Sequence, residues 1–502
     1  MTPRSQPGLK SAAVTRQAPP LPLWVNLLDA VALVYAVLAL SVVCVGGVDV
    51  SFLGVHVTAT ALPRVLLYCV GSLVVRHAVW RRHPLHRRLL TWVSRWRGSE
   101  SARAVWPVFA VSRIGVLTVG FLGVLLVGLS SDPPFRVSRN ELSNLSARWD
   151  AGWYLGIAED GYEAASGPET QQNIAFFPAY PVLTRAVGAL LGAGVVQRTV
   201  DPFPEASRRY VLAGLLVALG AFFAALVYLY RLARDCFDTR VARASVLLLA
   251  AYPFAIFFSA PYTESLFLLS AVATFYHFRR AEHGRAALWG LLAGLTKANG
   301  CLLSVPLAIL ALQQAGLLWR GASTRLVPVP TRTPAAHAGA MAAASMPGIG
   351  MVLFSAYLFL LTGRPLAWLD VHRLAWERSY VGLGDWALGR YGFVMDHDLY
   401  SYAVAEPIEL LYVVAVGLVL SLVWPVSRRL GLPYGVWMVL TVVPPLMAGG
   451  FVSMGRFTSV LFPLFLYAAA TLPRRWVVPA ALVSAQLQAL MAVLFYTWRP
   501  LY

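Results

Sequence analysis

One carboxylate in this chain stands where it can act as a general base. Asp150 lies in the stretch from Ser146 to Tyr162, which is rich in aromatic and acidic side chains. A carboxylate held close to an attacking hydroxyl group can accept its proton. A lipid-linked donor suits this position, because its reactive phosphate would lie at the depth of the headgroups. The alternative is that Asp150 only stabilises a helix dipole, an effect of about 0.3–1 kcal/mol.

The element that holds this carboxylate is predicted to be an amphipathic helix. Trp149, Trp153 and Ile157 recur at every fourth position, which is typical of one helical face, and Gly161 would end the helix. Tryptophan favours the headgroup region of a bilayer. We therefore expect the helix to lie on the outer leaflet and to hold Asp150 just above the membrane.

Three further acidic residues are candidates for the same site. Glu159 is nine positions beyond Asp150 and thus on the opposite helical face, whereas Asp160 lies nearer to the Asp150 side. Both can instead mark the solvated end of the helix. Glu264 follows Pro261, and proline is favoured at the first position of a helix. Glu264 therefore either stabilises a helix dipole or contributes to a sugar or acceptor site.

Three cations interrupt or border apolar segments, and they are predicted to bind a lipid phosphate. Arg113 lies within the apolar run 105–129, Lys297 between two short apolar halves, and Arg456 in a short turn. A charge inside an apolar run costs about 2.5–3.5 kcal/mol by insertion scales, so each is expected to have a partner. The alternative to a phosphate contact is an internal ion pair or snorkelling toward the interface.

The composition is that of a multi-pass membrane protein. The chain has 502 residues, of which 58% are hydrophobic and 13% charged, whereas globular chains carry about 25% charged residues. A soluble enzyme, a disordered chain and a secreted disulfide scaffold are thereby excluded. The net charge of +18 does not indicate nucleic-acid binding, because the basic residues are spread between hydrophobic segments.

Hydropathy predicts an all-α polytopic fold with about 11–13 transmembrane helices. A spanning helix needs about 20 apolar residues. Long candidates lie near 24–46, 61–80, 105–129, 208–230, 340–362, 406–424 and 477–497, and shorter ones near 244–258, 264–279, 286–297, 299–316, 434–449 and 457–472. Several of the shorter candidates are short enough to be half-helices or re-entrant segments.

The distribution of charged residues predicts how the chain is oriented in the membrane. With residues 1–23 inside, 24 of the 41 basic residues fall in inner loops, as the positive-inside rule requires, and 18 of the 23 acidic residues fall outside. Two long segments, 130–207 and 363–405, then face outward, and the partly apolar stretch 173–195 is expected to be interfacial or re-entrant. The acidic outer face is where we expect the chemistry.

Three sequence blocks resemble the PIG-V mannosyltransferases, which add the second mannose in GPI-anchor assembly. The blocks are Trp149-Asp150-Ala151 with Ile157-Ala158-Glu159 and Gly161-Tyr162, then Ala175-Phe-Phe-Pro178 with Tyr180-Pro181, then Phe257-Phe-Ser259-Ala260 with Tyr262-Thr263-Glu264. The resemblance covers roughly residues 105–320. Residues 1–80 and the loop 363–405 depart from it.

The resemblance implies a GT-C-type glycosyltransferase with its large first extracytoplasmic loop as part of the active site. It implies a polyprenyl- or dolichyl-phosphate mannose donor, inverting transfer to a glycolipid or glycan hydroxyl, and Asp150 as the base. The residues expected to bind substrate are Trp149, Tyr154, Glu159, Asp160, Tyr262 and Glu264, and those expected to contact the lipid phosphate are Lys297, Arg113 and Arg456. No cofactor, metal or nucleic-acid partner is expected.

The chain divides in this interpretation into three parts. Residues 1–104 form an inner leader, two additional helices and a basic loop; 105–320 form the catalytic core; and 321–502 supply the last helices. The Arg-rich composition favours a bacterial plasma membrane, with the active site on the extracytoplasmic face (the endoplasmic reticulum for eukaryotic relatives). The alternatives are a transporter or flippase of lipid-linked saccharides, or a GT-C enzyme that uses another sugar.

Overall fold

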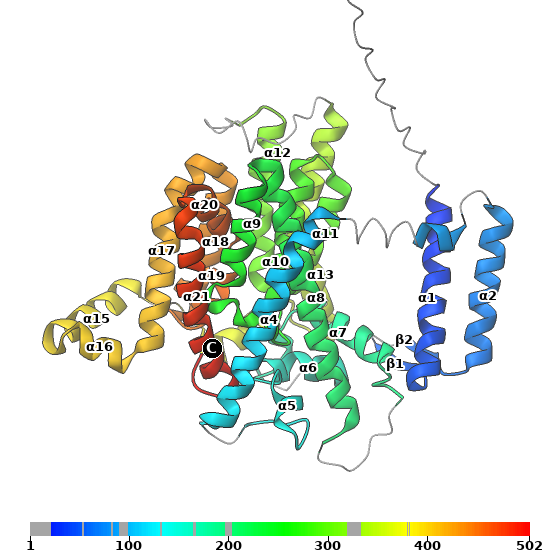
Figure 1. The fold of residues 1–502 in the computed structure, drawn as a ribbon, viewed down its shortest axis with the longest axis horizontal. Helices are drawn as coiled ribbons and strands as arrows, with labels where there is room; N and C mark the ends of the chain where they lie inside the picture. The colour runs from blue at the N-terminus through cyan, green and yellow to red at the C-terminus, as the bar shows by residue number, and fades with distance from the viewer. Residues whose placement is uncertain are drawn as a thin grey trace, which may run out of the picture.

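The computed structural model describes residues 22–52, 55–81, 84–89, 99–130, 133–163, 167–195, 203–318, 333–378, 380 and 382–501. The predicted inner leader up to residue 21, and parts of two predicted basic loops at 90–98 and 319–332, lie outside these ranges. Within them the chain is helical apart from one short β-hairpin (Figure 1).

Eight helices in the described ranges are long and apolar enough to cross a membrane, which confirms a polytopic membrane protein. They are α1 (Leu23–Val45), α2 (Leu62–Val79), α4 (Glu100–Leu126), α8 (Glu205–Cys236), α13 (Pro334–Thr362), α17 (Pro407–Leu430), α18 (Leu432–Gly449) and α21 (Arg474–Tyr496). A ninth span arises if α9 and η2, which meet at a bend of 80°, are counted as one.

The remaining predicted spans fall on helices of fewer than 18 residues. The short elements of the bundle are α9 (Thr239–Ala250), η2 (Pro253–Ser259), α10 (Glu264–Arg279), α11 (His283–Thr296), η3 (Ala298–Leu303), α12 (Ser304–Gln314), α19 (Met454–Ser459) and α20 (Phe462–Thr471). Eleven spans are reached when two of α10, α11, the η3–α12 pair and α20 are added to nine, and thirteen when all four are added. Their shortness leaves helix ends inside the protein.

Local sequence signals account for several helix boundaries. Ser99 accepts a hydrogen bond from the third residue of α4, and Asp238 and Thr333 do the same for α9 and α13. Gly46 and Gly363 end α1 and α13 in the left-handed conformation, with φ of 89° and 72°. Only glycine adopts this conformation without strain, so these positions are natural helix ends.

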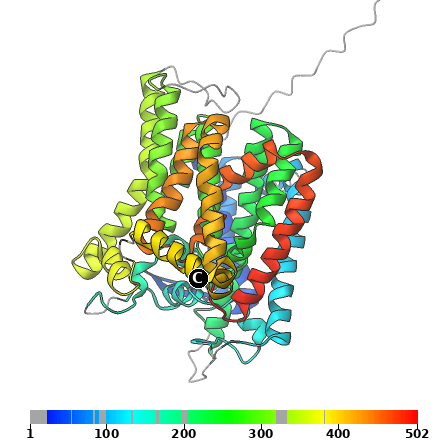
Figure 2. The same ribbon diagram turned by 90° about the vertical axis from the view of Figure 1, so that its left-hand side faces the viewer.

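The bundle is built around α10. Every residue from Glu264 to Phe275 is buried, and α10 packs against α8 and α11. In the view turned by 90°, several long helices of the bundle lie close to upright (Figure 2). A helix that is apolar around its whole circumference belongs in the interior of a large bundle.

A helical hairpin stands beside the bundle (Figure 1). It consists of α1 and α2, joined by strands β1 (Val48–Phe52) and β2 (Val55–Ala59), which pair antiparallel with Val48 opposite Ala59. Asp29 on α1 pairs with Arg76 on α2 at 2.5 Å, and both side chains are buried. The hairpin meets the core where the Gly194 backbone lies against Asp49, so close that a methyl group at Gly194 would overlap a backbone oxygen.

Short helices lie at or beside the predicted outer end of the bundle. They are α5 (Glu141–Asn144), α6 (Ala151–Asp160), η1 (Asn173–Ala175), α7 (Ala179–Leu190), α14 (Ala367–Leu374), α15 (Leu383–His397) and α16 (Leu399–Ala405). The stretch 173–195, expected to be interfacial or re-entrant, holds η1 and the short α7, and neither is among the candidate spans. In Figure 1, α15 and α16 project from the bundle on the side opposite the hairpin.

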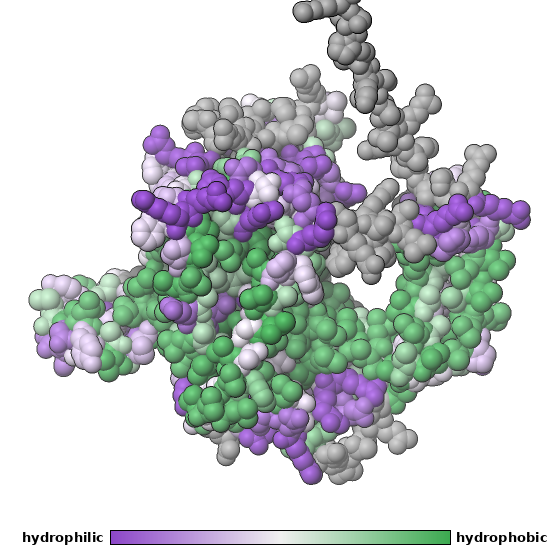
Figure 3. Space-filling model, viewed as in Figure 1, coloured by the Kyte–Doolittle hydropathy of each residue, from purple (hydrophilic) through white to green (hydrophobic). Residues whose placement is uncertain are grey.

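The surface agrees with a membrane-spanning bundle. On the face drawn in Figure 3, hydrophobic residues form a broad band across the molecule, and hydrophilic ones gather above and below it. Within the bundle, α13 packs against α11 and α21 against α4. Helices from the predicted catalytic core and from the predicted C-terminal part therefore form one interior, and the division into these two parts stays a prediction.

Candidate active site

A pocket of 1340 Å³ opens among the short helices and helix ends described above. Its charged wall includes Asp150, Lys297, Arg378 and Arg456. Its apolar wall is formed by residues of η3, α13 and α18: Cys301, Leu302, Met351, Pro444, Pro445 and Ala448. The pocket thus offers a cluster of charges next to a surface that suits a hydrocarbon chain.

Asp150 is the N-cap residue of α6, but its side chain does not cap the helix. It instead accepts a hydrogen bond from Arg456, with 2.5 Å between Oδ2 and Nη1. Oδ1 has no hydrogen-bond partner within the described ranges, and the side chain is 29% exposed. The carboxylate therefore presents one free oxygen to the pocket.

Arg456, on α19, links two carboxylates. While Nη1 binds Asp150, Nε donates to Glu264 Oε1 at 2.7 Å. The guanidinium also lies over the Tyr262 ring, 4.7 Å from its centroid, where the aromatic face attracts a cation. These contacts hold Arg456 in one orientation, in which it binds Asp150 Oδ2.

Glu264 starts α10 and is completely buried. Its Oε1 accepts from Arg456 and from Lys297 Nζ, the latter at 2.8 Å. Its Oε2 has no partner in the described part of the chain. A buried carboxylate needs opposite charges beside it, and two cations meet this need. Asp150, Glu264, Lys297 and Arg456 together form what we call the ion-pair network.

Lys297 lies at the break between α11 and η3, in an extended conformation. The break directs its ammonium group toward α10 and α19, where it lies 4.4 Å from the centroid of the Phe457 ring. The expected position between two short apolar halves is confirmed. Lys297 was expected to have a partner, because a charge inside an apolar run is costly, and that partner is Glu264.

Two tyrosines support the network. The Asp150 backbone N–H donates to the Tyr262 hydroxyl at 3.0 Å, and that hydroxyl donates to Arg148 O at 3.3 Å. Tyr154 lines the pocket and its hydroxyl lies 3.3 Å from Thr263 Oγ1. Burial, together with the nearby carboxylates, raises the pKa of Tyr154 well above its ordinary value, so it stays a neutral hydrogen-bonding group.

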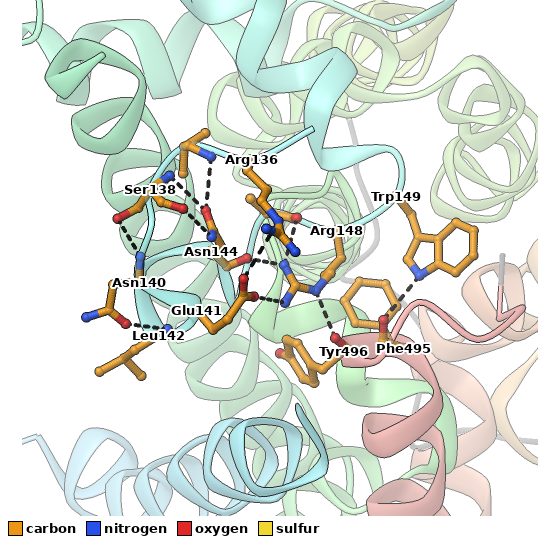
Figure 4. A network of polar contacts seen from close by, with 12 residues as sticks. Arg136, Ser138, Asn140, Glu141, Leu142, Asn144, Arg148, Trp149, Phe495 and Tyr496 are labelled. Atoms are coloured by element: carbon orange, nitrogen blue, oxygen red, sulfur yellow. Dashed lines mark hydrogen bonds and ion pairs between the residues drawn. The ribbon is translucent and has the colours of Figure 1, made fainter. Parts of the chain in front are cut away.

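The backbone before Asp150 is fastened to the end of α21 (Figure 4). Arg148 Nε donates to Tyr496 O at 2.8 Å, and Trp149 Nε1 donates to Phe495 O at 3.2 Å. The last carbonyls of a helix lack intrahelical partners, and these two side chains satisfy two of them. The position of Asp150 is thereby set from the far end of the chain.

Arg148 is itself held by a second set of contacts, which Figure 4 also shows. Arg148 Nη2 lies 3.5 Å from Glu141 Oε2, and Nη1 donates to the Asn144 carbonyl at 2.5 Å. Asn144 in turn accepts hydrogen bonds from the backbone N–H groups of Val137 and Ser138, both at 3.0 Å. The outer loop is thus folded around a buried arginine.

The structure differs from the predicted helix at its start, because Trp149 is not part of it. It was expected on one helical face with Trp153 and Ile157, but α6 begins only at Ala151 and Trp149 has a φ of 52°. This left-handed conformation turns the chain sharply, so that the indole packs against Trp498 instead of the helix. Trp149 still lines the pocket, and the predicted end at Gly161 is confirmed.

The two acids at the end of α6 differ in position. Glu159 lines the pocket, and both of its carboxylate oxygens accept from Ser207 Oγ, at 2.9 and 3.1 Å. Asp160 is exposed and is not among the residues that line the pocket. The prediction that Asp160 binds substrate therefore finds no support in its position.

The structure places Arg113 away from the pocket, so its predicted phosphate contact stays a prediction. Its side chain is buried and donates to the carbonyls of Ala250 and Ala255, at 2.9 and 2.6 Å, and to Ser259 Oγ at 3.0 Å. These acceptors lie at the bend between α9 and η2, where the broken helix leaves carbonyl groups without partners. Arg113 stabilises that bend and does not line the pocket.

Arg378 and His372 line the pocket and were not among the sequence candidates. His372 lies on α14, and Arg378 lies in the segment after it. His372 Nε2 lies 3.1 Å from Ala175 O. Burial lowers the pKa of His372 to about 4, so its ring is neutral at pH 7. Within the described ranges no group of three or more His, Cys, Asp or Glu residues is placed to hold a metal ion.

Comparison with known proteins confirms the resemblance stated from the sequence. Residues 126–361 match the family described as Mannosyltransferase (PIG-V). GPI alpha-1,6-mannosyltransferase 2 of Rattus norvegicus is 34% identical over 159 residues, which are 31% of this chain and 29% of that protein. GPI mannosyltransferase 2 of Chaetomium globosum is 28% identical over 265 residues, 46% of this chain and 52% of that one.

The matches are partial. The alignments span between about a third and a half of the curated relatives. The matched range holds Asp150, Glu264 and Lys297, whereas Arg378 and Arg456 lie beyond it. Among solved structures, the archaeal oligosaccharyltransferase AglB from Archaeoglobus fulgidus, in complex with an inhibitory peptide and a dolichol-phosphate, has a TM-score of 0.40 at 11% identity. That match covers 78% of this chain and 55% of AglB.

Proposed function

We propose that this protein is a GT-C-type membrane glycosyltransferase that transfers mannose from a polyprenyl-phosphate carrier to a hydroxyl group of a glycolipid or glycan. The observation that carries the proposal is the free Oδ1 of Asp150, which faces the pocket while Oδ2 is held by Arg456. The partial match to the PIG-V family and the names of the relatives support mannose as the sugar.

The reaction is a single displacement. Asp150 Oδ1 accepts the proton of the acceptor hydroxyl, and the hydroxyl oxygen forms a new bond to the anomeric carbon of mannose. The bond between that carbon and the phosphate oxygen breaks, and the electron pair leaves with polyprenyl phosphate. Attack opposite the leaving group inverts the anomeric carbon. The phosphate is a good leaving group, so one carboxylate is sufficient, in contrast to glycoside hydrolysis with its two carboxylates.

The ion-pair network prepares Asp150 for this step. Arg456 fixes one carboxylate oxygen, so the other keeps a constant direction toward the pocket. General-base catalysis requires the acceptor within hydrogen-bond reach of that oxygen. Lys297 and Arg456 both line the pocket, as expected for phosphate contacts, and each already donates to Glu264. Lys297 retains further N–H donors for a substrate.

The apolar and aromatic walls complete the substrate site. Trp149 and Tyr154 line the pocket next to Asp150 and offer the flat surfaces that suit a sugar ring, while Glu159 offers a carboxylate for sugar hydroxyls. Tyr262 supports the Asp150 backbone from behind. We propose that the reaction takes place on the extracytoplasmic face, because the loops that build the pocket are predicted to lie opposite the basic loops. The Arg-rich composition favours a bacterial plasma membrane.

The test is transfer of label by purified protein. Wild type, Asp150→Asn and the control Asp385→Asn would each receive radiolabelled polyprenyl-phosphate mannose and a membrane lipid extract. Asp385 lies on α15, is exposed and does not line the pocket, so its loss removes the same charge elsewhere. We expect Asp150→Asn to lower transfer by about 10²–10⁴-fold, the usual contribution of a general base, and Asp385→Asn to transfer like wild type.

Two outcomes would contradict the proposal. Undiminished transfer by a well-folded Asp150→Asn protein would remove Asp150 from the mechanism. Movement of labelled donor across sealed vesicles without its consumption would indicate a transporter of lipid-linked saccharides. Label from another polyprenyl-phosphate sugar transferred in place of mannose would keep the mechanism and change the sugar.

A further inference from the structure

Arg378 is the one pocket-lining cation in the described part of the chain that no carboxylate neutralises. Its guanidinium makes only two long contacts, to Val452 O at 3.3 Å and to Ser453 Oγ at 3.4 Å. Lys297 and Arg456 each contact a carboxylate within 2.8 Å, and Arg136 lies 3.8 Å from Glu141. The guanidinium of Arg378 therefore has donors available for a ligand.

The ion-pair network and Arg378 together carry a surplus of one positive charge. In the ion-pair network the carboxylates of Asp150 and Glu264 balance the cations of Lys297 and Arg456. Arg378 adds one positive charge to the same pocket. A partly buried, unbalanced cation is costly, and an anionic ligand would remove that cost. The phosphodiester of a lipid-linked sugar carries one negative charge, which matches the surplus.

The backbone is shaped to hold Arg378 at this place. The preceding residue, Glu377, has a φ of 52°, a left-handed conformation that turns the chain after α14. The Arg378 side chain then lies over the end of α18, where a methyl group at Gly449 would overlap it. Ser453, which it contacts, is the N-cap residue of α19 and accepts from the Arg456 backbone N–H at 2.9 Å through its carbonyl. Arg378 is thus joined to the helix that carries Arg456.

The neighbouring wall indicates what the anion is attached to. Pro444, Pro445 and Ala448 of α18 line the same pocket as Arg378, and Met351 of α13 lines it as well. A hydrocarbon chain is stabilised by such a wall at about 25 cal/mol per Å² of buried apolar surface, whereas a free inorganic anion gains nothing from it. The ligand that fits both features is a phosphate on a long apolar chain.

We propose that Arg378 binds the phosphate of the lipid-linked donor and selects phosphorylated polyprenyl carriers over uncharged ones. This inference rests on the proposed function for the identity of the donor. As the anomeric carbon–oxygen bond breaks, the phosphate changes from a diester with one negative charge to a monoester with a second ionisable oxygen. A fixed cation at this place stabilises the developing charge. Arg378 would therefore affect both donor binding and turnover.

The experiment measures binding without transfer. Purified protein in detergent would receive polyprenyl phosphate, the uncharged polyprenol of equal length, or inorganic phosphate, and affinity would be followed by the quenching of tryptophan fluorescence in the pocket. The variants are Arg378→Gln, Arg378→Lys and Gly449→Ala, which moves the side chain while keeping its charge. The matched control is Arg373→Gln, because Arg373 is exposed on α14 and does not line the pocket.

We expect wild type and Arg373→Gln to prefer polyprenyl phosphate to polyprenol. Arg378→Gln should bind polyprenyl phosphate about ten- to a hundredfold more weakly, the usual effect of losing hydrogen bonds to a charged group, and polyprenol unchanged. Arg378→Lys and Gly449→Ala should fall between. Inorganic phosphate should not compete at concentrations where polyprenyl phosphate saturates.

The inference is overturned if Arg378→Gln keeps the full preference for polyprenyl phosphate, or if inorganic phosphate competes as well as the lipid. Failure of the proposed function is a separate result. A protein that transfers no mannose but loses its phosphate preference in Arg378→Gln would contradict the assigned reaction and support the anion site.

Discussion

Replacing Glu264 with Gln tests whether the ion-pair network holds the site together. A glutamine amide oxygen can take the place of Oε1 and keep accepting from Lys297 and Arg456. The amide nitrogen would take the place of Oε2, which has no partner in the described part of the chain. Shape and the Oε1 acceptor are thus retained and the charge is removed, while the amide nitrogen brings two N–H donors to the place of Oε2. The Glu264→Gln variant therefore tests mainly the electrostatic contribution.

The expected size follows from burial. The side chains are 0% exposed for Glu264, 14% for Lys297 and 9% for Arg456. Arg456 keeps Asp150 as a partner, so Lys297 is the cation left without a carboxylate. Breaking a buried pair in this way costs about 3–5 kcal/mol, and the remaining Asp150 contact places our expectation near the lower end, about 3 kcal/mol.

The matched control is Glu409→Gln. Glu409 accepts from Arg390 at 2.7 and 2.8 Å, and the two side chains are 19% and 38% exposed. The same chemical change in this half-exposed pair should cost about 0–1 kcal/mol. Unfolding by sodium dodecyl sulfate in mixed micelles, followed by tryptophan fluorescence, would measure both losses of unfolding free energy.

A double-mutant cycle makes the result decisive. In Glu264→Gln/Lys297→Met the uncompensated charge is gone, so the double variant should lose less than the sum of the two single variants. Equal small losses for Glu264→Gln and Glu409→Gln, or strictly additive losses in the cycle, would refute the reasoning that the network balances buried charge.

Two further predictions concern the frame of the pocket. Arg148→Met removes the bond to Tyr496 O and loosens the backbone at Asp150, so turnover should fall by about tenfold or more while the KM for donor changes little; an unchanged turnover number would show that the anchor is dispensable. The pKa of His372 is lowered from 6.5 to about 4. Between these two pH values the unfolded chain therefore binds a proton at His372 that the folded protein does not bind. Stability should therefore fall as pH drops from 6.5 to 4, by on the order of 1–3 kcal/mol, and melting curves of His372→Gln should lack this part of the fall; identical pH profiles would contradict it.

The sequence predicted the members of the ion-pair network better than their contacts. Lys297 and Arg456 were candidates because a charge within or beside an apolar run needs a partner. Asp150 and Glu264 were candidates because of their places in predicted helices and in the blocks that resemble the PIG-V family. Which charge pairs with which depends on how α6, α10, the α11–η3 break and α19 meet. Lys297 and Glu264 are 33 positions apart, and Arg456 and Asp150 are 306 apart, so no local periodicity relates them.

Arg113 and Arg378 show where sequence reasoning fails. Arg113 resembles Lys297 in the printed sequence, since both are single cations in apolar surroundings, yet the carbonyls freed by the α9–η2 bend bind it outside the pocket. Arg378 lies in a polar loop, where a cation needs no explanation, and a single residue with positive φ turns it into the pocket. Bends and turns of this kind arise from packing, and they cannot be predicted from hydropathy.

The hydrogen bond between Arg148 and the end of α21 also bears on how the protein folds during its synthesis. Arg148 and Tyr496 are 348 residues apart in sequence. A ribosome delivers about 5–20 residues per second, so the outer loop waits roughly 20–70 seconds for the helix that anchors it. Contacts of such long range form late in folding. The geometry around Asp150 is therefore completed only after α21 has been inserted, and a partly synthesised chain in the membrane lacks the finished pocket.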